Sequence, residues 1–148
     1  MVFRNGTSTD ENWLFEMFRE NLRDYIDEAW GWDELLQHAG FTTSLPARQF
    51  TILESDGERV GCFHLSQKPD HILLDMILVA AASQGKGFGT GLMNRIKSRA
   101  VALDLPLELN VLSSNPAIGF HRRHGFREIS TSGQSVRMRW TGPEASQS

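Results

Sequence analysis

The sequence predicts an α/β fold in which helices cover both faces of one mixed β-sheet. Apolar residues recur at helical spacing up to residue 39, and between residues 49 and 80 they follow strand patterns instead. From residue 88 to residue 140 we expect a helix, a strand, a short helix and two strands, an order typical of a sheet layered with helices. The 148 residues, of which 40% are hydrophobic, are enough for a single domain with one core.

The N-terminal third is predicted to form one short strand and two helices. Residues 2–4 are strand-like, and Asp10 is predicted to cap the first helix, because its carboxylate can accept N–H groups of the first turn. The apolar residues that follow at helical spacing are Leu14, Met17, Phe18, Leu22, Tyr25, Ile26 and Ala29. Gly31 interrupts this pattern, and residues 32–39 are predicted to form a second, shorter helix.

Three strands are expected in the middle of the chain. Residues 49–54 and 59–67 are predicted to pair as a hairpin, because Asp56-Gly57 is a strong signal for a two-residue turn. Residues 71–80 form an almost continuous apolar run, which is typical of a strand buried on both faces.

A glycine-rich stretch over residues 84–91 separates this strand from an amphipathic helix. The apolar side of the helix carries Phe88, Leu92, Met93, Ile96, Ala100 and Leu103. Pro106 is expected to end the helix, since proline cannot continue it, and residues 107–112 follow as a strand.

The last elements are a short helix and a hairpin. Asn115-Pro116 is predicted to open the helix, because proline suits the first helical turn, and Gly125 is predicted to end it. Residues 126–131 and 135–140 are expected to pair as the final hairpin.

Charge and composition exclude several classes of protein. The net charge of -3 gives no support to nucleic-acid binding, which usually needs a strongly basic surface. Cys62 is the only cysteine, so an internal disulfide is excluded, and its apolar neighbours predict a buried thiol in a reducing compartment. The first residues lack the apolar stretch of a signal peptide, and no apolar run approaches the roughly 20 residues that span a bilayer. We therefore expect a cytoplasmic protein with no membrane partner.

The strongest functional signal is the glycine-rich run at residues 84–89 (QGKGFG). Such a turn before a helix points backbone N–H groups into one concavity next to the positive helix end, which suits a phosphate or pyrophosphate. It is not a P-loop, because Gly87 rather than Ser or Thr follows Lys86. It is not the dinucleotide fingerprint either, because neither glycine pair is followed by a glycine three places on. A flexible loop before a helix is the simpler alternative.

A second block, residues 115–126 (NPAIGFHRRHGF), follows about 30 residues later. The Q-x-x-G-x-G loop after a buried strand, followed by this block with its leading Asn and final Gly-Phe, resembles the GNAT superfamily of N-acetyltransferases. The resemblance implies a GNAT-like, mostly antiparallel sheet of about seven strands, whose fourth and fifth strands are parallel and splayed. It implies a single acetyltransferase domain over residues 1–140. Residues 141–148 (TGPEASQS) are polar and are expected to be a disordered tail.

The resemblance also implies the reaction and its co-substrate. Acetyl-CoA is expected to donate its acetyl group to a primary amine of a small molecule or peptide, by direct attack of the neutral amine in a ternary complex and without a metal. The loop would hold the pyrophosphate, the strand backbone the thioester, and an Asn side chain the pantetheine arm. The residues expected in these roles are Gln84, Gly85, Lys86, Gly87, Phe88, Gly89 and Thr90, then Ile77, Leu78 and Val79, then Asn115. A homodimer is left open.

His121 departs from the family pattern, which usually has a tyrosine here as the acid that protonates the departing sulfur. With a reference pKa near 6.5, about a quarter of an unperturbed histidine is charged at pH 7, and the neutral ring can still donate one hydrogen bond. We predict that His121 is the catalytic acid. The alternative is a surface histidine in the basic run 121–124, facing CoA phosphates or water.

Asp75 lies inside an otherwise apolar strand, where an unpaired charge is seldom tolerated. Strand alternation puts it on the same face as Ile77 and Val79. It is predicted to be either the general base, with a pKa raised by desolvation, or a structural carboxylate paired with an arginine or a helix end. His64 and Glu108 are weaker candidates for the base.

The acceptor amine is expected to bind near the first two helices. There Tyr25, Trp30 and Trp32 could hold a cationic amine by cation–π contact or simply pack. The acceptor stays open among polyamines, amino acids, antibiotics and protein termini. Two other functions also stay open: a non-catalytic acyl-CoA-binding module, and a protein-interaction domain that has kept only the fold. No cluster of His, Cys and Asp has the spacing of metal ligands.

Overall fold

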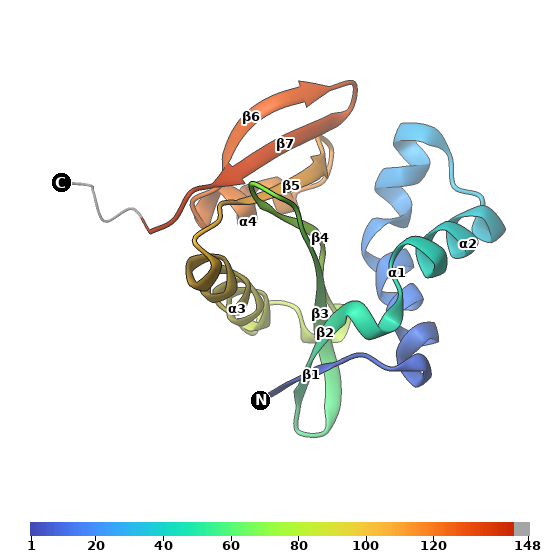
Figure 1. Cartoon of the computed structure of the whole chain (residues 1–148). Helices are drawn as coiled ribbons and strands as arrows, with labels where there is room; N and C mark the ends of the chain where they lie inside the picture. Colours follow the sequence, from blue (N-terminus) through green and yellow to red (C-terminus); the bar gives the residue numbers. More distant parts are fainter. Residues whose placement is uncertain (144–148) are drawn as a thin grey trace. The chain divides into compact units, whose positions relative to one another are not determined.

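The computed structural model describes residues 1–143, which form a seven-stranded sheet flanked by helices (Figure 1). The strand order is β1-β2-β3-β4-β5-β7-β6, and β4 pairs with β5 in parallel. The strands are β1 (Val2–Asn5), β2 (Phe50–Ser55), β3 (Glu58–Gln67), β4 (Ile72–Val79), β5 (Leu107–Leu112), β6 (Arg127–Ser132) and β7 (Ser135–Trp140). The α-helices are α1 (Glu11–Trp30), α2 (Glu34–Ser44), α3 (Phe88–Leu103) and α4 (Ala117–Arg123). The predicted mixed α/β fold is confirmed.

Three short 3₁₀ turns, which were not predicted from the sequence, connect these elements. They are η1 (Ser8–Asp10), η2 (Ala47–Gln49) and η3 (Ala81–Ser83). The predicted disordered tail covers residues 141–148, and its residues 144–148 lie outside the described residues.

The chain divides into two compact units. Unit 1 consists of Met1–Leu65 and Met76–Leu92, and unit 2 consists of Ser66–Asp75 and the chain from Met93 onward. Unit 1 therefore contains β1, β2, α1 and α2, whereas β5, β6, β7 and α4 belong to unit 2. The single domain expected over residues 1–140 stays a prediction.

Unit 1 is built on an antiparallel arrangement in which β2 pairs with both β1 and β3. Asp56 and Gly57 have φ values of 53° and 79°, the left-handed pair that a two-residue hairpin turn requires, so this predicted hairpin is confirmed. Helices α1 and α2 lie on the same side of these strands (Figure 1). The core that they share consists of Leu14, Phe15, Met17, Phe18, Phe41, Ala47, Phe50, Ile52, Cys62 and Leu78.

The start of α1 is stabilised differently from the prediction. The helix begins at Glu11 as expected, yet the Asp10 side chain makes no capping bond to it. The Asp10 carboxylate instead accepts the Thr7 backbone N–H at 2.8 Å, the Arg4 guanidinium at 2.8 and 2.9 Å, and Arg59 at 3.0 Å. These hydrogen bonds, from Arg4 above all, hold the pKa of this buried carboxyl well below its usual range. Asp10 therefore links β1 and β3 to the segment that leads into α1.

Helix α2 starts later and runs further than predicted, spanning Glu34–Ser44 rather than residues 32–39. The Asp33 Oδ1 atom accepts the Leu36 N–H at 3.0 Å and so caps the first turn. Phe41 extends the buried face beyond the predicted end of the helix and joins the core. The prediction of a second helix is confirmed, but its boundaries were wrong.

Strand β4 is buried on one face only, whereas its apolar run predicted burial on both. Ile72, Leu74 and Leu78 are buried. The alternate positions, which are partly exposed, are Leu73, Asp75, Ile77 and Val79. A run of branched apolar residues suits either environment, so the sequence pattern did not distinguish the two faces.

Unit 2 contains the C-terminal strands and α4. Strand β7 pairs antiparallel with β5 and with β6, and Figure 1 shows β6 and β7 as a hairpin. Leu107 of β5 lies opposite Ile72 of β4 in the parallel pair. Gly125, with φ of 91°, follows the last turn of α4 and ends it as predicted.

Candidate functional site

The glycine-rich loop connects η3 to α3 inside unit 1. Gly85 and Gly87 have φ values of 78° and 86°, in the left-handed region that L side chains rarely adopt. A Cβ atom at either position would meet no other atom within 4 Å. Glycine is therefore required by the backbone turn and not by packing, and the loop surface is open, as expected of a loop that a phosphate approaches.

Helix α1 holds the beginning of this loop. Gln84 Nε2 donates to the Val79 carbonyl at 3.1 Å and to Asn21 Oδ1 at 3.3 Å, and Asn21 Nδ2 donates to the same carbonyl at 3.3 Å. Glu20 accepts the Ala81 N–H at 2.7 Å. Glu20 and Asn21 were not predicted from the sequence, because no local pattern indicates hydrogen bonds to a loop about 60 residues away.

The end of β4, where the thioester was expected, also lies in unit 1. The Leu78 side chain is buried in the core, while Ile77 and Val79 are partly exposed. A Cβ atom at Gly61 of β3 would lie 2.9 Å from the Leu78 carbonyl oxygen. Gly61 is therefore needed for the close approach of β3 to this strand, a role that no sequence pattern predicted.

Asn115 lies in unit 2 just before α4, which begins at Ala117 after Pro116 as the N-cap. Its side-chain Oδ1 atom accepts the Ala117 N–H at 2.9 Å, and its backbone N–H donates to Leu112. The side-chain oxygen therefore supports the helix start. The side-chain NH₂ group is the part of Asn115 that could donate to a ligand.

His121 lies buried in α4, with 4% of its surface exposed, so the alternative of a surface histidine is wrong. Its ring packs edge-on against Phe120 and Phe126. Burial, and then the charge of His124, lower the pKa of His121 to about 4, so the imidazole is neutral at pH 7. Within residues 1–143, its Nδ1 atom has no hydrogen-bond partner.

Asp75 is only partly buried, in contrast to the expectation for a strand enclosed on both faces. The Ser66 hydroxyl donates to Asp75 Oδ2 at 2.6 Å, and both residues belong to unit 2. This carboxylate is therefore oriented by a neighbouring side chain and is still accessible.

The two weaker candidates for a base are both buried. His64 packs edge-on against Phe50, with ring centres 4.9 Å apart. Glu108 lies between Arg137 and Arg139, which donate to it at 2.8 and 2.9 Å. Burial alone would raise the pKa of Glu108, but these two hydrogen bonds outweigh burial and lower it. Glu108 is therefore part of an ion-pair network and a poor proton acceptor.

The aromatic residues that were expected to bind the amine differ in their surroundings. Trp32 packs against Phe15 and Phe18, with ring centres 6.4 and 5.7 Å apart. Trp30, in contrast, is 67% exposed at the end of α1, and Tyr25 is partly exposed. Trp30 is therefore the most exposed of the three, while Tyr25 and Trp32 are both partly exposed.

The candidate residues thus form two groups. Unit 1 holds the loop, the end of β4 and the aromatic residues of α1, and unit 2 holds Asp75, Asn115 and His121. A family model described as the acetyltransferase (GNAT) family matches residues 11–126, a range that includes both groups. The chain belongs to the acetyltransferase (GNAT) family. The resemblance seen in the two sequence motifs is confirmed, and this GNAT protein is an acyltransferase.

Solved structures share the fold of this GNAT protein. PaiA N-acetyltransferase from Thermoplasma acidophilum, in complex with coenzyme A, is 16% identical with a TM-score of 0.73, over 93% of this chain and 96% of that chain. Ard1 from Thermoplasma volcanium is 17% identical with a TM-score of 0.74, over 97% and 98%. The ribosomal-protein-S18-alanine N-acetyltransferase from Escherichia coli is 19% identical with a TM-score of 0.69, over 93% and 90%. No curated protein matches the sequence.

Two further properties concern the described part of this GNAT protein, residues 1–143. Among residues 1–143, no group of three His, Cys, Asp or Glu side chains is arranged to hold a metal ion. None of the helices in this part of the chain has the length and apolar character to cross a membrane. The metal-free reaction, the cytoplasmic location and the homodimer stay predictions.

Proposed function

We propose that this GNAT protein transfers an acetyl group from acetyl-CoA to a primary amine in a ternary complex, without a covalent enzyme intermediate. The observation that carries the proposal is the open loop before α3, with left-handed glycines at positions 85 and 87, in a chain of this family. Its backbone N–H groups and the positive end of α3 suit the pyrophosphate of acetyl-CoA. The exposed Lys86 adds a cationic side chain.

The reaction needs a group that accepts one proton from the attacking amine. The neutral amine nitrogen attacks the thioester carbonyl, a C–N bond forms, the C–S bond breaks, and the nitrogen must lose a proton as the sulfur leaves. We assign this proton to Asp75, whose carboxylate is accessible and oriented by Ser66. The alternatives suit the role less, because Glu108 is held by two arginines and His64 is enclosed in the core.

His121 can assist the departing sulfur only in its neutral form. With a pKa of about 4, roughly one molecule in a thousand carries the charged ring at pH 7. An imidazolium acid is therefore not the resting state of the enzyme. The neutral ring can donate one hydrogen bond to the developing thiolate, from whichever nitrogen carries the proton.

One observation favours a second candidate function, an acyl-CoA-binding module without catalysis. The family usually has a tyrosine here, which acts as the acid in the reaction. In this chain the position holds a buried, neutral histidine, His121. If the hydrogen bond from His121 does not support the departure of the sulfur, the protein would bind acetyl-CoA without transferring its acetyl group.

The acceptor is proposed to meet the exposed aromatic surface of α1. Trp30 and Tyr25 offer ring faces on which a cationic amine can bind before it loses its proton. Trp32 is already used in packing against Phe15 and Phe18.

Two measurements test the proposal together: the thermal stabilisation of the protein by acetyl-CoA, and the release of free thiol from acetyl-CoA in the presence of a panel of amines. We expect both stabilisation and thiol release in the parent protein. Gly87→Val should abolish both, because a β-branched side chain resists the positive φ and blocks approach to the backbone.

Gly57→Val is the matched control. Gly57 has a similar φ of 79°, also has open space around its Cβ position, and lies in the β2–β3 turn. The Gly57→Val variant should lose stability as Gly87→Val does, but acetyl-CoA should still raise its melting temperature. Equal stabilisation of the Gly87→Val variant and the parent would show that the loop does not bind the coenzyme. Stabilisation without thiol release for any amine would identify the binding module.

A further inference from the structure

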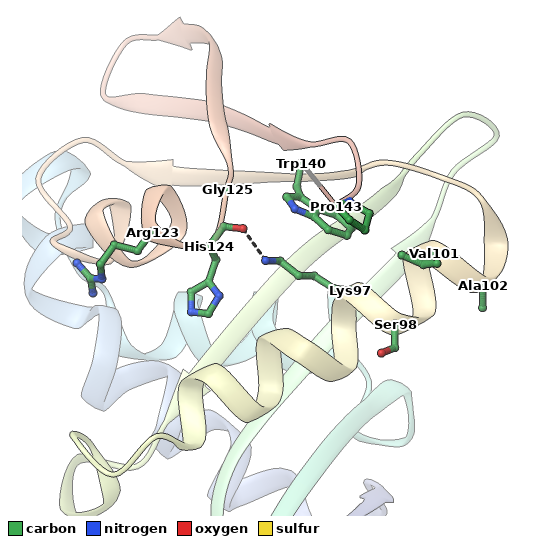
Figure 2. Close-up of a pocket in the computed structure, with 9 residues that line it drawn as sticks. All are labelled: Lys97, Ser98, Val101, Ala102, Arg123, His124, Gly125, Trp140 and Pro143. Atoms are coloured by element: carbon green, nitrogen blue, oxygen red, sulfur yellow. Dashed lines mark hydrogen bonds between the residues drawn. The ribbon is translucent and has the colours of Figure 1, made fainter. Parts of the chain in front are cut away.

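The strands of unit 2 have one apolar face and one polar face. Along β7, buried Met138 and Trp140 alternate with Arg137 and Arg139, so the two pairs of side chains point to opposite faces. Figure 2 shows Trp140 beside Lys97 of α3, whose ammonium nitrogen lies 5.0 Å from the centre of the indole ring. Helix α3 therefore lies on the apolar face, and the two arginines point to the other one.

The polar face also carries side chains of β4 and β5. Glu108 of β5 lies opposite Arg139 of β7 and opposite Leu73 of β4. Residues paired across two strands point to the same face, and so do residues two positions apart along one strand. Asp75, two positions after Leu73, therefore shares this face with Glu108 and both arginines. Since paired strands are about 4.8 Å apart, the backbones of Leu73 and Arg139 are on the order of 10 Å apart, a distance that two side chains and one small molecule can bridge.

Glu108 holds both arginines in place. Its Oε1 atom lies 2.8 Å from Nε and 2.7 Å from Nη2 of Arg137, and its Oε2 atom lies 2.9 Å from Nε and 2.8 Å from Nη2 of Arg139. A guanidinium group has five N–H donors, so each arginine keeps three that these contacts do not use. One carboxylate between two guanidinium groups also leaves one positive charge in excess.

Arg139 is the more available of the two arginines. Arg137 Nη2 also lies 3.3 Å from His71 Nε2, whereas the side-chain hydrogen bonds of Arg139 in the described part of the chain go to Glu108. The Arg139 side chain is 44% exposed. Asp70 is the other carboxylate close enough to respond to the charge of Arg139, and its Oδ1 atom is bonded to His71 Nδ1 at 2.7 Å. The outer edge of the Arg139 guanidinium, Nη1 and Nη2, is therefore a planar fork of the kind that binds a carboxylate with two parallel hydrogen bonds.

We propose that the acceptor of the transfer reaction is an amino acid, a small molecule that carries a carboxylate as well as its primary amine. The acceptor carboxylate accepts hydrogen bonds from the outer edge of Arg139, and the amine lies towards Asp75, which accepts its proton. A fixed cation and an accessible carboxylate on one face suit the two opposite charges of such an acceptor. This inference rests on the proposed transfer and on Asp75 as its base.

Thiol release from acetyl-CoA with three matched pairs of acceptors tests the inference. The pairs are glycine with ethylamine, β-alanine with propylamine, and γ-aminobutyrate with butylamine. The members of a pair differ only in a carboxylate or a methyl group at the end of the chain, and the three pairs vary the distance between amine and carboxylate. For at least one pair, we expect kcat/KM, calculated for the neutral amine, to be at least about tenfold higher for the amino acid.

Three variants show whether this preference depends on Arg139. Arg139→Gln should reduce the preference for the amino acid about tenfold and leave kcat/KM for the alkylamine close to that of the parent, because only the carboxylate contact is lost. The ratio within a pair does not depend on the fraction of folded protein, so a less stable variant can still be compared. Arg139→Lys keeps the charge without the planar fork and should retain part of the preference. Arg99→Gln removes an exposed arginine of α3, the helix on the opposite face, and should leave the ratio unchanged.

The outcomes separate this inference from the proposed transfer. Equal kcat/KM within all three pairs, or an equal loss of preference in Arg99→Gln, would overturn the inference and leave the transfer intact. If no acceptor releases thiol, calorimetric titration of the CoA-saturated protein with the same pairs decides. Tighter binding of an amino acid than of its alkylamine, weakened by Arg139→Gln, would support the carboxylate site and reject the transfer. Equal binding or no binding of both members of every pair would reject both.

Discussion

At the scale of single residues, His121 couples the stability of the fold to pH. Its pKa in the folded chain is about 4, whereas a histidine in an unfolded chain titrates near 6.5. Between these two values the unfolded chain binds more protons, so the stabilisation is present above pH 6.5 and is lost as the pH falls towards 4. The lowered pKa of His124 acts in the same direction.

His121→Phe should remove this dependence while keeping a ring between Phe120 and Phe126. In the parent, the histidine should account for a loss of about 2 kcal/mol in the free energy of unfolding between pH 7 and pH 5. Denaturant unfolding at both pH values, for parent and variant, measures the difference. Equal losses in the two proteins would show that the pKa of His121 is not depressed.

Asp75→Asn separates a catalytic carboxylate from a structural one. The asparagine oxygen can still accept the hydrogen bond from Ser66, so we expect the melting temperature to change little. Turnover should fall by roughly 10²–10⁴, the usual contribution of a general base. Ser66→Ala keeps the carboxylate but removes its hydrogen bond, and should alter the pH profile more than the maximal rate. A rate equal to that of the parent for Asp75→Asn across the pH range would exclude Asp75 as the general base.

At the scale of elements, the start of α4 combines a structural and a binding role in one side chain. Asn115→Ala removes both the hydrogen bond to Ala117 and the NH₂ donor. We expect a loss of about 1 kcal/mol in stability from the lost hydrogen bond to the Ala117 N–H, and CoA binding weaker by about 1–2 kcal/mol. Calorimetric titration with CoA measures the second effect.

Asp33→Ala provides the control for that experiment, because Asp33 caps α2 through a similar bond to Leu36. It should show the same loss of stability and an unchanged affinity for CoA. If Asn115→Ala also leaves the affinity for CoA unchanged, the side chain of Asn115 stabilises the helix and does not bind CoA.

At the scale of the whole molecule, the side chains that carry most of the stability are those enclosed between helices and sheet. Leu14 is 1% exposed in the core of unit 1, and Leu35 is 83% exposed on α2. Leu14→Ala should cost about 2–5 kcal/mol of unfolding free energy, and Leu35→Ala less than about 0.5 kcal/mol. Thermal or denaturant unfolding measures both, and similar costs would contradict the described core.

Much of the architecture could be predicted because its signals are local. The hairpin at Asp56-Gly57 and the end of α4 at Gly125 depend on turn conformations that few residues other than glycine adopt. The boundaries of α2 could not be predicted in this way, because Leu35 and Leu36 at its start are exposed and give no buried face. The two faces of β4 could not be separated either, because branched apolar residues occupy both.

The sequence by itself determined the order of the elements, the glycine-rich loop and the family, since spacing and turn chemistry act within a few residues. Only the tertiary structure decided the hydrogen-bond partners of Asp10, which lie up to 49 positions away. It also decided the hydrogen bonds by which Glu20 and Asn21 hold the start of the glycine-rich loop. It also decided that His121 is neutral. These properties depend on strand register and on removal of water from side chains, neither of which has a local signature in the sequence.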